Sequence, residues 1–443
     1  MKKRILSIVL LAAMLFSMNP AQQAVAAQSA PDIEGTSAVI VDAKTGETLW
    51  QKDAGTVRPV ASMTKVMAAY LVYEAIQEGR ITMETPVPIS TYTYYFSRDN
   101  VYSNIPFQWD KVYTVRDMLE AFLCYSACAA GPALGELLYG SEESFVAAMN
   151  AKAQEWGLAA RFDQSYDEGY MSAQAMAAIA KHVLDEQPEM LEITALKEFE
   201  FGGKIYPSSN ALLDENDASI GTVDGLKTGW TPMAGSCMAA TSSKNGMRLI
   251  TVTMNASAVN ARYSDSEKLL RYGFSLLEER LQEGYAYATP NIAAVNMNGG
   301  QLSMQAYMAD GNNYVRLRDF AAVLNGTGSQ FGLSYDAATG TVVINNGAPY
   351  DGTNSGGSLE GGPVMSQLRQ PVVRVDGQDY AIDAYLIGDL NYMKIRDLCD
   401  AIGCGIDWDP TTGQVILLPK ATTATADASQ QAATDSTVAA DAA

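Results

Sequence analysis

The sequence predicts an α/β domain over residues 32–285, followed by a small α+β repeat domain over residues 294–418. Three observations support this fold class. Strand-like alternation of apolar residues marks both ends of the first segment, helical spacing dominates between them, and an imperfect repeat fills the second segment. A chain of 443 residues, 48% of them hydrophobic, is long enough for two or three domains.

Within the first domain, two hairpins enclose a helical region. Residues 37–52 predict a hairpin around Lys44-Thr45-Gly46, and the apolar runs 236–243 and 247–254 flank the turn Lys244-Asn245-Gly246. Helical spacing of apolar residues predicts helices at 61–77, 144–156, 172–184 and 264–281, and two further helical stretches within 114–138. Strands at both ends with helices inserted between them are typical of an α/β domain.

The N-terminus has the pattern of a secretion signal. Lys2, Lys3 and Arg4 precede an apolar stretch over residues 5–16, and Ala24-Val25-Ala26 offers a cleavage site. The apolar stretch is too short for a comfortable membrane span. We expect residues 1–26 to be a removed signal peptide, and the mature protein to be exported, secreted or wall-associated, without a transmembrane span.

Charge and residue usage exclude several classes of function. A formal net charge of −20 argues against a nucleic-acid partner, because phosphate binding needs clustered lysine and arginine. Five cysteines are too few, and odd in number, for a disulfide scaffold, although a Cys399–Cys404 bridge stays open. The single histidine, His182, leaves no base for a Ser-His-Asp triad and no His-rich metal site. We therefore expect no metal and no cofactor.

Ser62 and Lys65 form the first candidate catalytic element. A serine hydroxyl needs a base to become a good nucleophile, and lysine is the natural substitute where histidine is missing. The spacing in Ser62-Met63-Thr64-Lys65 puts both side chains on one helical face, near the positive end of the helix. Alone the signal is weak, since an N-cap serine with an exposed lysine shows the same pattern.

Two further elements follow in order along the chain. Ser126-Ala127-Cys128 comes after the apolar helix 115–124, and Lys227-Thr228-Gly229 begins an apolar run suited to an edge strand lining a cleft. Three ordered elements, each in a suitable local context, are far more specific than any one of them.

The order resembles the Ser-x-x-Lys, Ser-x-Asn, Lys-Thr-Gly set of penicillin-recognising serine enzymes. Four flanking segments resemble the low-molecular-mass penicillin-binding proteins of the serine-type D-alanyl-D-alanine carboxypeptidase family, over about residues 32–283: 59–65, 113–119, 223–231 and 261–270. This resemblance implies a β-lactamase/transpeptidase-like fold, an antiparallel sheet flanked by helices plus a helical subdomain.

The resemblance also implies a role for each matching residue. Ser62 would attack the carbonyl between two D-alanines of a peptidoglycan stem peptide, Lys65 would take its proton, and Ser126 would relay it to the leaving D-alanine. Lys227 would hold Ser126, with Gly229 completing its motif. Thr228 and Arg262 would bind the substrate carboxylate, and the backbone N–H groups of Ser62 and Trp230 would form the oxyanion hole. Water would release the acyl group, and β-lactam antibiotics would acylate Ser62 as covalent inhibitors.

Cys128 departs from the family pattern, which has asparagine there. In the family, the asparagine amide would donate to a carbonyl of the substrate and accept from Lys65. A thiol is a weak donor and acceptor and cannot replace both of these hydrogen bonds. This keeps two alternatives open: a DD-transpeptidase using an amine acceptor, and a non-catalytic sensor of wall peptide or penicillin. Residues 162–166 also depart from the family pattern. A β-lactamase is disfavoured, because no Glu-x-x-Leu-Asn element lies between the second and third motifs.

The second domain contains two similar units. Residues 314–320 match 392–398, residues 335–340 match 408–413, and each unit predicts a strand, a short helix and a hairpin. They resemble the copper amine oxidase N-terminal-like domain of secreted bacterial proteins, although copper is not expected without histidine. We expect contact with the cell wall or a spacer role, and a purely structural appendage is an equal alternative. The Gly/Ser-rich residues 346–362 and the tail 421–443 are predicted to be flexible and disordered, respectively.

Overall fold

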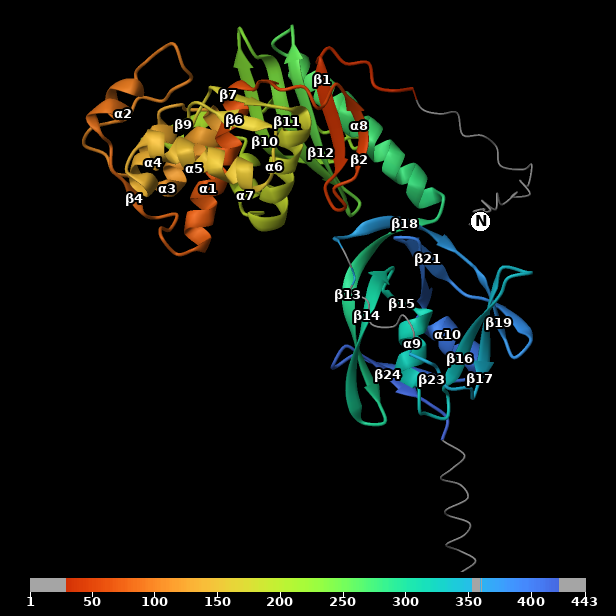
Figure 1. Ribbon diagram of the computed structural model, residues 1–443. Helices are drawn as coiled ribbons and strands as arrows, with labels where there is room; N and C mark the ends of the chain where they lie inside the picture. The colour runs from red at the N-terminus through yellow and green to blue at the C-terminus, as the bar shows by residue number, and fades with distance from the viewer. Residues whose placement is uncertain (1–28, 353–358, 360, 422–443) are drawn as a thin grey trace, which may run out of the picture.

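The computed structural model describes residues 29–352, 359 and 361–421. The predicted signal peptide, part of the Gly/Ser-rich segment and almost all of the predicted tail lie outside these residues. Figure 1 shows two lobes: a larger one built around a sheet with a cluster of helices beside it, and a smaller β-rich lobe below the end of helix α8.

The larger lobe contains a five-stranded antiparallel sheet in the order β10-β11-β12-β1-β2. The sheet strands are β1 (Ser37–Asp42), β2 (Thr48–Lys52), β10 (Thr222–Thr231), β11 (Gly235–Lys244) and β12 (Met247–Ala256). The two predicted hairpins are confirmed. Asn245 and Gly246, both with positive φ, make the tight turn between β11 and β12.

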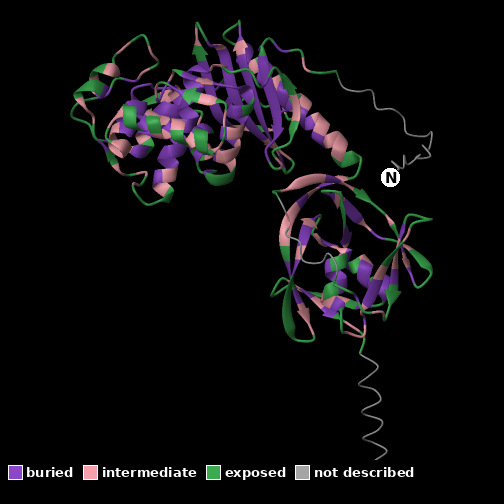
Figure 2. Ribbon diagram, in the orientation of Figure 1, coloured by how far each residue is buried: buried purple, intermediate pink, exposed green. Residues whose placement is uncertain are grey.

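Alternation along β1 shows how the sheet is covered on both faces. Ala38 and Ile40 pack with α8 residues such as Phe274, whereas Val39 and Val41 join the large core formed with the helical region. Figure 2 shows the inner strands β1, β11 and β12 mostly buried between these layers, whereas the edge strand β2 is exposed or half-buried. The predicted α/β class is correct for this lobe.

The predicted helices of the larger lobe lie close to their ranges, and the stretch 114–138 contains two helices, the first continued by a short helical turn. Two short helices, at 91–96 and 190–194, were not predicted. The helices are α1 (Lys65–Gln77), α2 (Thr91–Phe96), α3 (Val115–Glu120), α4 (Ala130–Tyr139), α5 (Glu142–Glu155), α6 (Ala173–Glu186), α7 (Met190–Thr194) and α8 (Ala261–Gln282). Three short helical turns complete them: the 3-10 turns η1 (Ala61–Thr64) and η3 (Ala211–Asp214), and the π-helical turn η2 (Ala121–Tyr125). Serine side chains cap α5 and α6, and Thr114 forms a capping box with Asp117 at α3.

Short strands tie the helical cluster together. They are β3 (Arg58–Pro59), β4 (Pro86–Val87), β5 (Tyr113–Thr114), β6 (Ala160–Phe162), β7 (Gly169–Met171), β8 (Glu198–Phe201) and β9 (Lys204–Pro207). The hairpin of β6 and β7 pairs with β3, directly before η1. This pairing brings the loop between β6 and β7 to the segment that carries Ser62.

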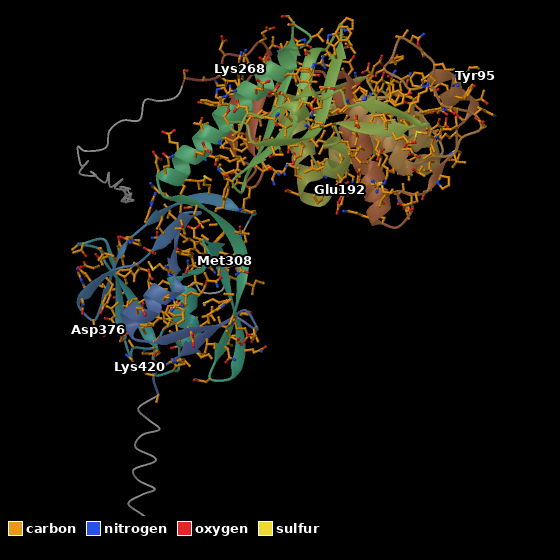
Figure 3. All side chains as sticks on the ribbon, turned by 180° about the vertical axis from the view of Figure 1, so that it is seen from behind. Tyr95, Glu192, Lys268, Met308, Asp376 and Lys420 are labelled. Carbon is orange, nitrogen blue, oxygen red and sulfur yellow. The ribbon has the colours of Figure 1, made fainter. Side chains whose placement is uncertain are left out.

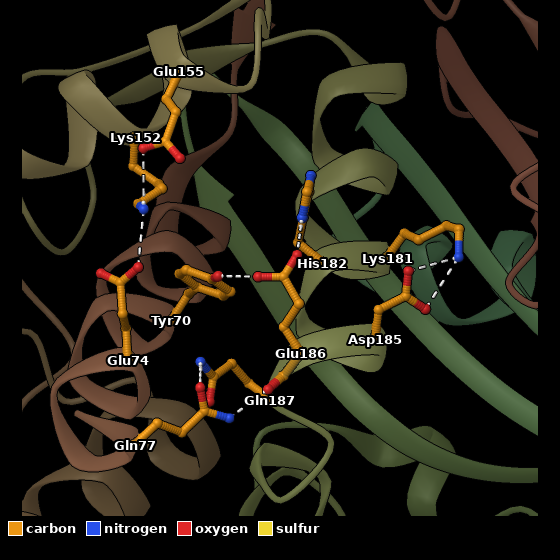
Figure 4. A network of polar contacts seen from close by, with 10 residues as sticks. All are labelled: Tyr70, Glu74, Gln77, Lys152, Glu155, Lys181, His182, Asp185, Glu186 and Gln187. Carbon is orange, nitrogen blue, oxygen red and sulfur yellow. Dashed lines mark hydrogen bonds and ion pairs between the residues drawn. The ribbon is translucent and has the colours of Figure 1, made fainter. Parts of the chain in front are cut away.

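A network of polar contacts joins α1, α5 and α6 (Figure 4). His182 lies here: its ring stacks on Trp156 at 3.8 Å between centroids, and its Nδ1 is 2.6 Å from Glu186 Oε1. Tyr70 also hydrogen-bonds Glu186, and Lys152 bonds Glu74 at 2.9 Å. The one histidine of the chain therefore contacts packing partners rather than any of the three motifs.

The smaller lobe is a six-stranded barrel with additions. Strands β14, β15, β22, β21, β18 and β13 pair in that order, and β13 pairs again with β14 to close the ring. A further hairpin, β23 and β24, extends from β13, and a separate four-stranded sheet has the order β16-β17-β19-β20.

The smaller lobe's elements begin directly after α8. Its strands are β13 (Tyr285–Met297), β14 (Gly300–Ala309), β15 (Asn312–Arg316), β16 (Phe331–Asp336), β17 (Thr341–Asn346), β18 (Val364–Arg369), β19 (Val372–Val375), β20 (Gln378–Ala381), β21 (Ala384–Ile387), β22 (Leu390–Lys394), β23 (Gly405–Asp409) and β24 (Gln414–Leu418). Its helices are α9 (Leu317–Leu324) and α10 (Ile395–Ile402).

The two sequence repeats are related by a crossed, two-fold-like arrangement. Strands β15 and β22 pair antiparallel with the equivalent residues Val315 and Met393 opposite each other. Tyr307 packs edge-on against Tyr392 at 4.8 Å, and Tyr385 packs the same way against Tyr314 at 4.7 Å. Each repeat thus supplies one tyrosine to each pair. The four tyrosine side chains lie in one core that both repeats share.

Candidate active site

The three sequence motifs meet at one edge of the sheet. Ser62 lies in η1, Ser126 follows η2, and Lys227 lies on the edge strand β10, as predicted for a strand lining a cleft. Two residues in these segments have strained backbones: Ala61 has φ of 49° and Ser126 has φ of 73°. Such strain persists where surrounding structure enforces it, commonly at functional sites.

Lys65 is placed to act on Ser62. Its side chain is 0% exposed, and its Nζ lies 2.7 Å from Ser62 Oγ. The same Nζ donates to the carbonyl oxygen of Tyr166 at 2.6 Å and to Cys128 Sγ at 3.4 Å. The alternative of an exposed lysine beside a capping serine is therefore wrong.

Cys128 occupies the inner wall of the site, 2% exposed. Its backbone N–H donates to the carbonyl oxygen of Ser103 at 2.8 Å, and its thiol lies 3.6 Å from the carbonyl oxygen of Ser126. Burial raises the pKa of the Cys128 thiol, with Lys65 opposing this shift. The side chain therefore presents a neutral thiol to Lys65.

Strand β10 supplies the opposite wall. Lys227 is buried, and its Nζ contacts the carbonyl oxygen and Oγ1 of Thr228, at 3.1 and 3.4 Å. Burial, together with the nearby charge of Lys65, lowers the pKa of Lys227 to about 7. Thr228 Oγ1 also lies 3.1 Å from Ser209 Oγ. The expected hydrogen bond from Lys227 to Ser126 is therefore not formed, and Lys227 Nζ instead contacts its neighbour Thr228 in the Lys-Thr-Gly motif.

Gly229 allows β10 to approach the nucleophile closely. A Cβ at this position would lie 2.6 Å from the carbonyl oxygen of Val60, two residues before Ser62. Arg262, at the start of α8, donates to the carbonyl oxygen of Gly229 at 2.9 Å, and its burial lowers the pKa of its guanidinium. Trp230 follows on the strand with its side chain half exposed. The backbone N–H groups of Ser62 and Trp230 therefore come from two segments in direct contact.

Asp167 is a site residue that the sequence analysis missed. It lies in the loop between β6 and β7, with Oδ1 3.3 Å from Ser62 Oγ. Burial raises the pKa of this carboxyl, while Lys65 opposes the shift. Gly169 lets the loop pack so closely, because a Cβ there would lie 2.3 Å from Thr64 Oγ1. The available signal was the acidic pair Asp167-Glu168, directly after the segment that departs from the family pattern.

A cleft of 230 Å³ opens beside the nucleophile segment, lined by Ala61, Asp167, Tyr170, Thr231 and Met233, among others. It runs between the β6–β7 loop and the end of β10. Within residues 29–352, 359 and 361–421 there is no cluster of three or more metal-ligating side chains, and no helix is long and apolar enough to cross a bilayer. The site's reactive groups are two buried serines, two buried lysines, a buried thiol, an arginine and one carboxylate.

Comparison with known proteins places this arrangement in a family. Residues 24–258 match the model of the S11 peptidases, described as D-alanyl-D-alanine carboxypeptidase. The chain is 32% identical to D-alanyl-D-alanine carboxypeptidase DacF of Bacillus subtilis, over 62% of this chain and 72% of that protein. It is 30% identical to DacC of Escherichia coli, over 56% of this chain and 63% of that protein.

Solved structures agree. Penicillin binding protein 6B from Escherichia coli is 25% identical, with a TM-score of 0.54 over 64% of this chain and 87% of that one. A mutant of the Streptomyces K15 DD-transpeptidase is also 25% identical, with a TM-score of 0.50 over 56% of this chain and 100% of that one. The family match covers just over half of the chain and includes Ser62, Ser126 and Lys227. The chain belongs to the S11 family of serine-type D-alanyl-D-alanine carboxypeptidases, the penicillin-binding proteins of low molecular mass.

Proposed function

We propose that this protein removes the terminal D-alanine from peptidoglycan stem peptides ending in D-Ala-D-Ala, through an acyl-enzyme on Ser62. The observation that carries the proposal is the buried pair of Lys65 Nζ and Ser62 Oγ at 2.7 Å. A general base must lie within hydrogen-bond reach of the proton that it takes, and this one does. Family membership supplies the substrate class.

Each further residue has a role that its position supports. Lys65 takes the Ser62 proton as the oxygen attacks the carbonyl between the two D-alanines. The backbone N–H groups of Ser62 and Trp230 stabilise the oxyanion. Ser126 passes the proton to the departing amine of D-alanine. Thr228 binds the terminal carboxylate, with Arg262 holding the strand and adding positive charge.

Release of the acyl group needs an activated water, and Asp167 is the carboxylate nearest to Ser62 Oγ in the site. We assign it the role of orienting and deprotonating this water. A carboxyl whose pKa is raised by burial is a better base near neutral pH than an exposed one. The same steps predict that β-lactams acylate Ser62.

A second function, DD-transpeptidation with an amine acceptor, is favoured by one observation. The thiol of Cys128 stands in contact with Lys65, where the family has an amide. The related Streptomyces K15 protein is named as a DD-transpeptidase. The two functions differ only in what attacks the acyl group.

The decisive experiment uses diacetyl-Lys-D-Ala-D-Ala with and without a D-amino acid acceptor. Free D-alanine and any transfer product are followed together. We expect D-alanine release by the mature protein and none by Ser62→Ala. Release in proportion to acceptor, with none in water, would favour transpeptidation, and labelling of Ser62→Ala by a fluorescent penicillin would refute the assignment of the nucleophile.

A further inference from the structure

The smaller lobe contains two surface clefts built from equivalent positions of its two repeats. The first cleft, 710 Å³, is lined by Arg316, Arg318, Tyr335 and Asn391, among others. The second cleft, 280 Å³, is lined by Lys394, Arg396, Trp408 and Asn313, among others. In the repeat alignment these residues correspond one to one, in the order given.

The clefts are crossed between the repeats. In each, the helix start and the aromatic hairpin come from one repeat, and the asparagine turn comes from the other. The turn before β22, at Asp389, and the turn before β15, at Gly311, both have positive φ, so the backbone is also equivalent. Figure 3 shows Met308, which lines the second cleft, in this lobe, well separated from Tyr95 of the larger lobe. Packing of the barrel core explains why the equivalent tyrosines are buried. It does not explain why the two polar clefts also have equivalent residues.

Each cleft exposes one large aromatic ring. Tyr335 is 63% exposed and Trp408 is 46% exposed. Among the described residues after 284, these two are the exposed aromatic side chains. Their hairpins are firmly held, because Asp336 and Asp409 accept hydrogen bonds from the threonines that close each turn. An exposed ring on a rigid hairpin offers a flat apolar face at low entropic cost.

Each cleft also carries an arginine available to a ligand. Arg318 and Arg396 are exposed, and neither guanidinium has an ion pair or hydrogen bond within the described part of the chain. Acidic side chains balance the cations, with Asp389 in the first cleft and Asp407 in the second. Mixed donors and acceptors beside an aromatic face suit a polyhydroxylated ligand with amide groups better than a simple anion.

We propose that the two clefts bind N-acetylated amino sugars of the glycan strands of peptidoglycan. One sugar ring stacks on Tyr335 and another on Trp408, while the arginine and asparagine side chains bond hydroxyl and acetamido groups. Two equivalent sites on one rigid lobe match a polymer of repeating sugars and bind it with avidity. The sugar chemistry rests on the clefts alone. Only the benefit of holding the catalytic lobe near stem peptides rests on the proposed function.

The test uses the mature chain carrying Ser62→Ala, so that turnover does not alter the probe. Insoluble peptidoglycan stripped of its anionic polymers measures binding by co-sedimentation, and chitotetraose serves as the soluble competitor. The variants are Y335A, W408A, the double variant and R318A/R396A. Ile292→Ala, which removes another highly exposed apolar side chain of the same lobe, is the matched control.

We expect Y335A and W408A each to weaken co-sedimentation, and the variant that combines them to weaken it by at least about ten-fold. Co-sedimentation of the Ile292→Ala control should be unchanged. Chitotetraose should quench tryptophan fluorescence in Y335A but not in W408A. Unchanged binding by the double variant would overturn the proposal. So would binding that chitotetraose does not compete, because the occupant would then be another wall component or a protein.

D-alanine release by the same variants in the active Ser62 background separates the two proposals. Loss of glycan binding with normal D-alanine release supports the clefts independently of catalysis. Unchanged melting of each variant by circular dichroism shows that its lobe is folded.

Discussion

Two residues on different sides of Ser62 serve the two steps of the proposed reaction: Lys65 serves acylation and Asp167 serves deacylation. Lys65 approaches the hydroxyl from the core, between Cys128 and the carbonyl oxygen of Tyr166, and Asp167 approaches it from the β6–β7 loop. The three contacts of Lys65 fix its amine in one place. Asp167 accepts from Ser62 Oγ through its carboxylate and from Thr64 Oγ1 through its backbone carbonyl. Neither of these hydrogen bonds involves Lys65 Nζ, so the two groups can be separated by mutation.

Asp167→Asn is expected to slow deacylation and to spare acylation. The amide keeps the size and a hydrogen bond to Ser62 but cannot accept a proton from water. Labelling by a fluorescent penicillin should stay within about three-fold, while the lifetime of the label lengthens by at least about ten-fold. Asp163→Asn, in the same loop but paired with Arg161, is the control. Equal lifetimes for both variants would remove Asp167 from the reaction.

Cys128→Asn is expected to speed D-alanine release. An amide can accept from Lys65 and donate to a substrate carbonyl at once, which a thiol does poorly. Steady-state release from diacetyl-Lys-D-Ala-D-Ala measures the effect, and Cys128→Ala, which adds no amide, should not raise the rate. If release by Cys128→Asn equals that of the parent, the thiol does not limit turnover.

Among the elements, the edge strand β10 packs directly against the segment that carries the nucleophile. It carries Lys227, Thr228 and Trp230 on one side of the cleft while Gly229 lies against Val60. The close approach sets the distance between the oxyanion donors on β10 and on η1. An oxyanion donor loses most of its effect when it is displaced from the oxygen that it must bind.

Gly229→Ala is therefore expected to reduce acylation by at least about ten-fold, because the added Cβ must move β10 away from Ser62. The second-order rate of labelling by a fluorescent penicillin measures this effect. Gly55→Ala is the matched control, since a Cβ there meets only Gln174 Oε1, at 3.8 Å. An acylation rate like that of the control would show that the strand tolerates the displacement.

At the scale of the whole molecule, the buried lysine makes stability depend on pH. Lys227 has a pKa of about 7 in the folded protein, against 10.5 when exposed. Between these values the unfolded chain binds more protons than the folded chain, so the contribution of Lys227 to the free energy of unfolding rises with pH. Below about pH 7 both states are protonated and the cost of burying the charge is greatest.

The variant Lys227→Met has no titrating group at this position. Its free energy of unfolding is therefore expected to lose the part of the pH dependence that Lys227 contributes. Urea unfolding of both proteins at about pH 6 and about pH 9 measures the free energy of unfolding. The parent should gain stability relative to Lys227→Met as the pH rises. Parallel pH profiles would contradict the low pKa of Lys227.

The two lobes are joined by packing as well as by the chain. Tyr287 of β13 packs with the α8 layer of the larger lobe, and the Lys44 ammonium lies 4.2 Å from the centre of its ring. The smaller lobe therefore has a defined contact with the catalytic lobe, on the side of the sheet that is covered by α8. Neither sugar-binding cleft proposed above is lined by residues of this contact.

The sequence by itself determined the elements and the chemistry that depends on local spacing. The apolar run of β1, the Asn245-Gly246 turn and the separation of Ser62 from Lys65 are all short-range features. The repeat of Tyr314 and Tyr392 likewise indicated two equivalent units. The roles of the motif residues came from resemblance, because spacing alone left Ser62 and Lys65 open to an ordinary capping interpretation.

Only the tertiary structure decided which distant groups meet. Asp167 reaches Ser62 because Gly169 and the pairing of β3 with β7 bring its loop onto η1, and no local pattern encodes that contact. Likewise, the crossing of the two repeats places Asn391 in one cleft with Tyr335, and Asn313 in the other cleft with Trp408. Contacts of this kind depend on packing between elements far apart in the chain, whereas sequence patterns report mainly the local backbone period.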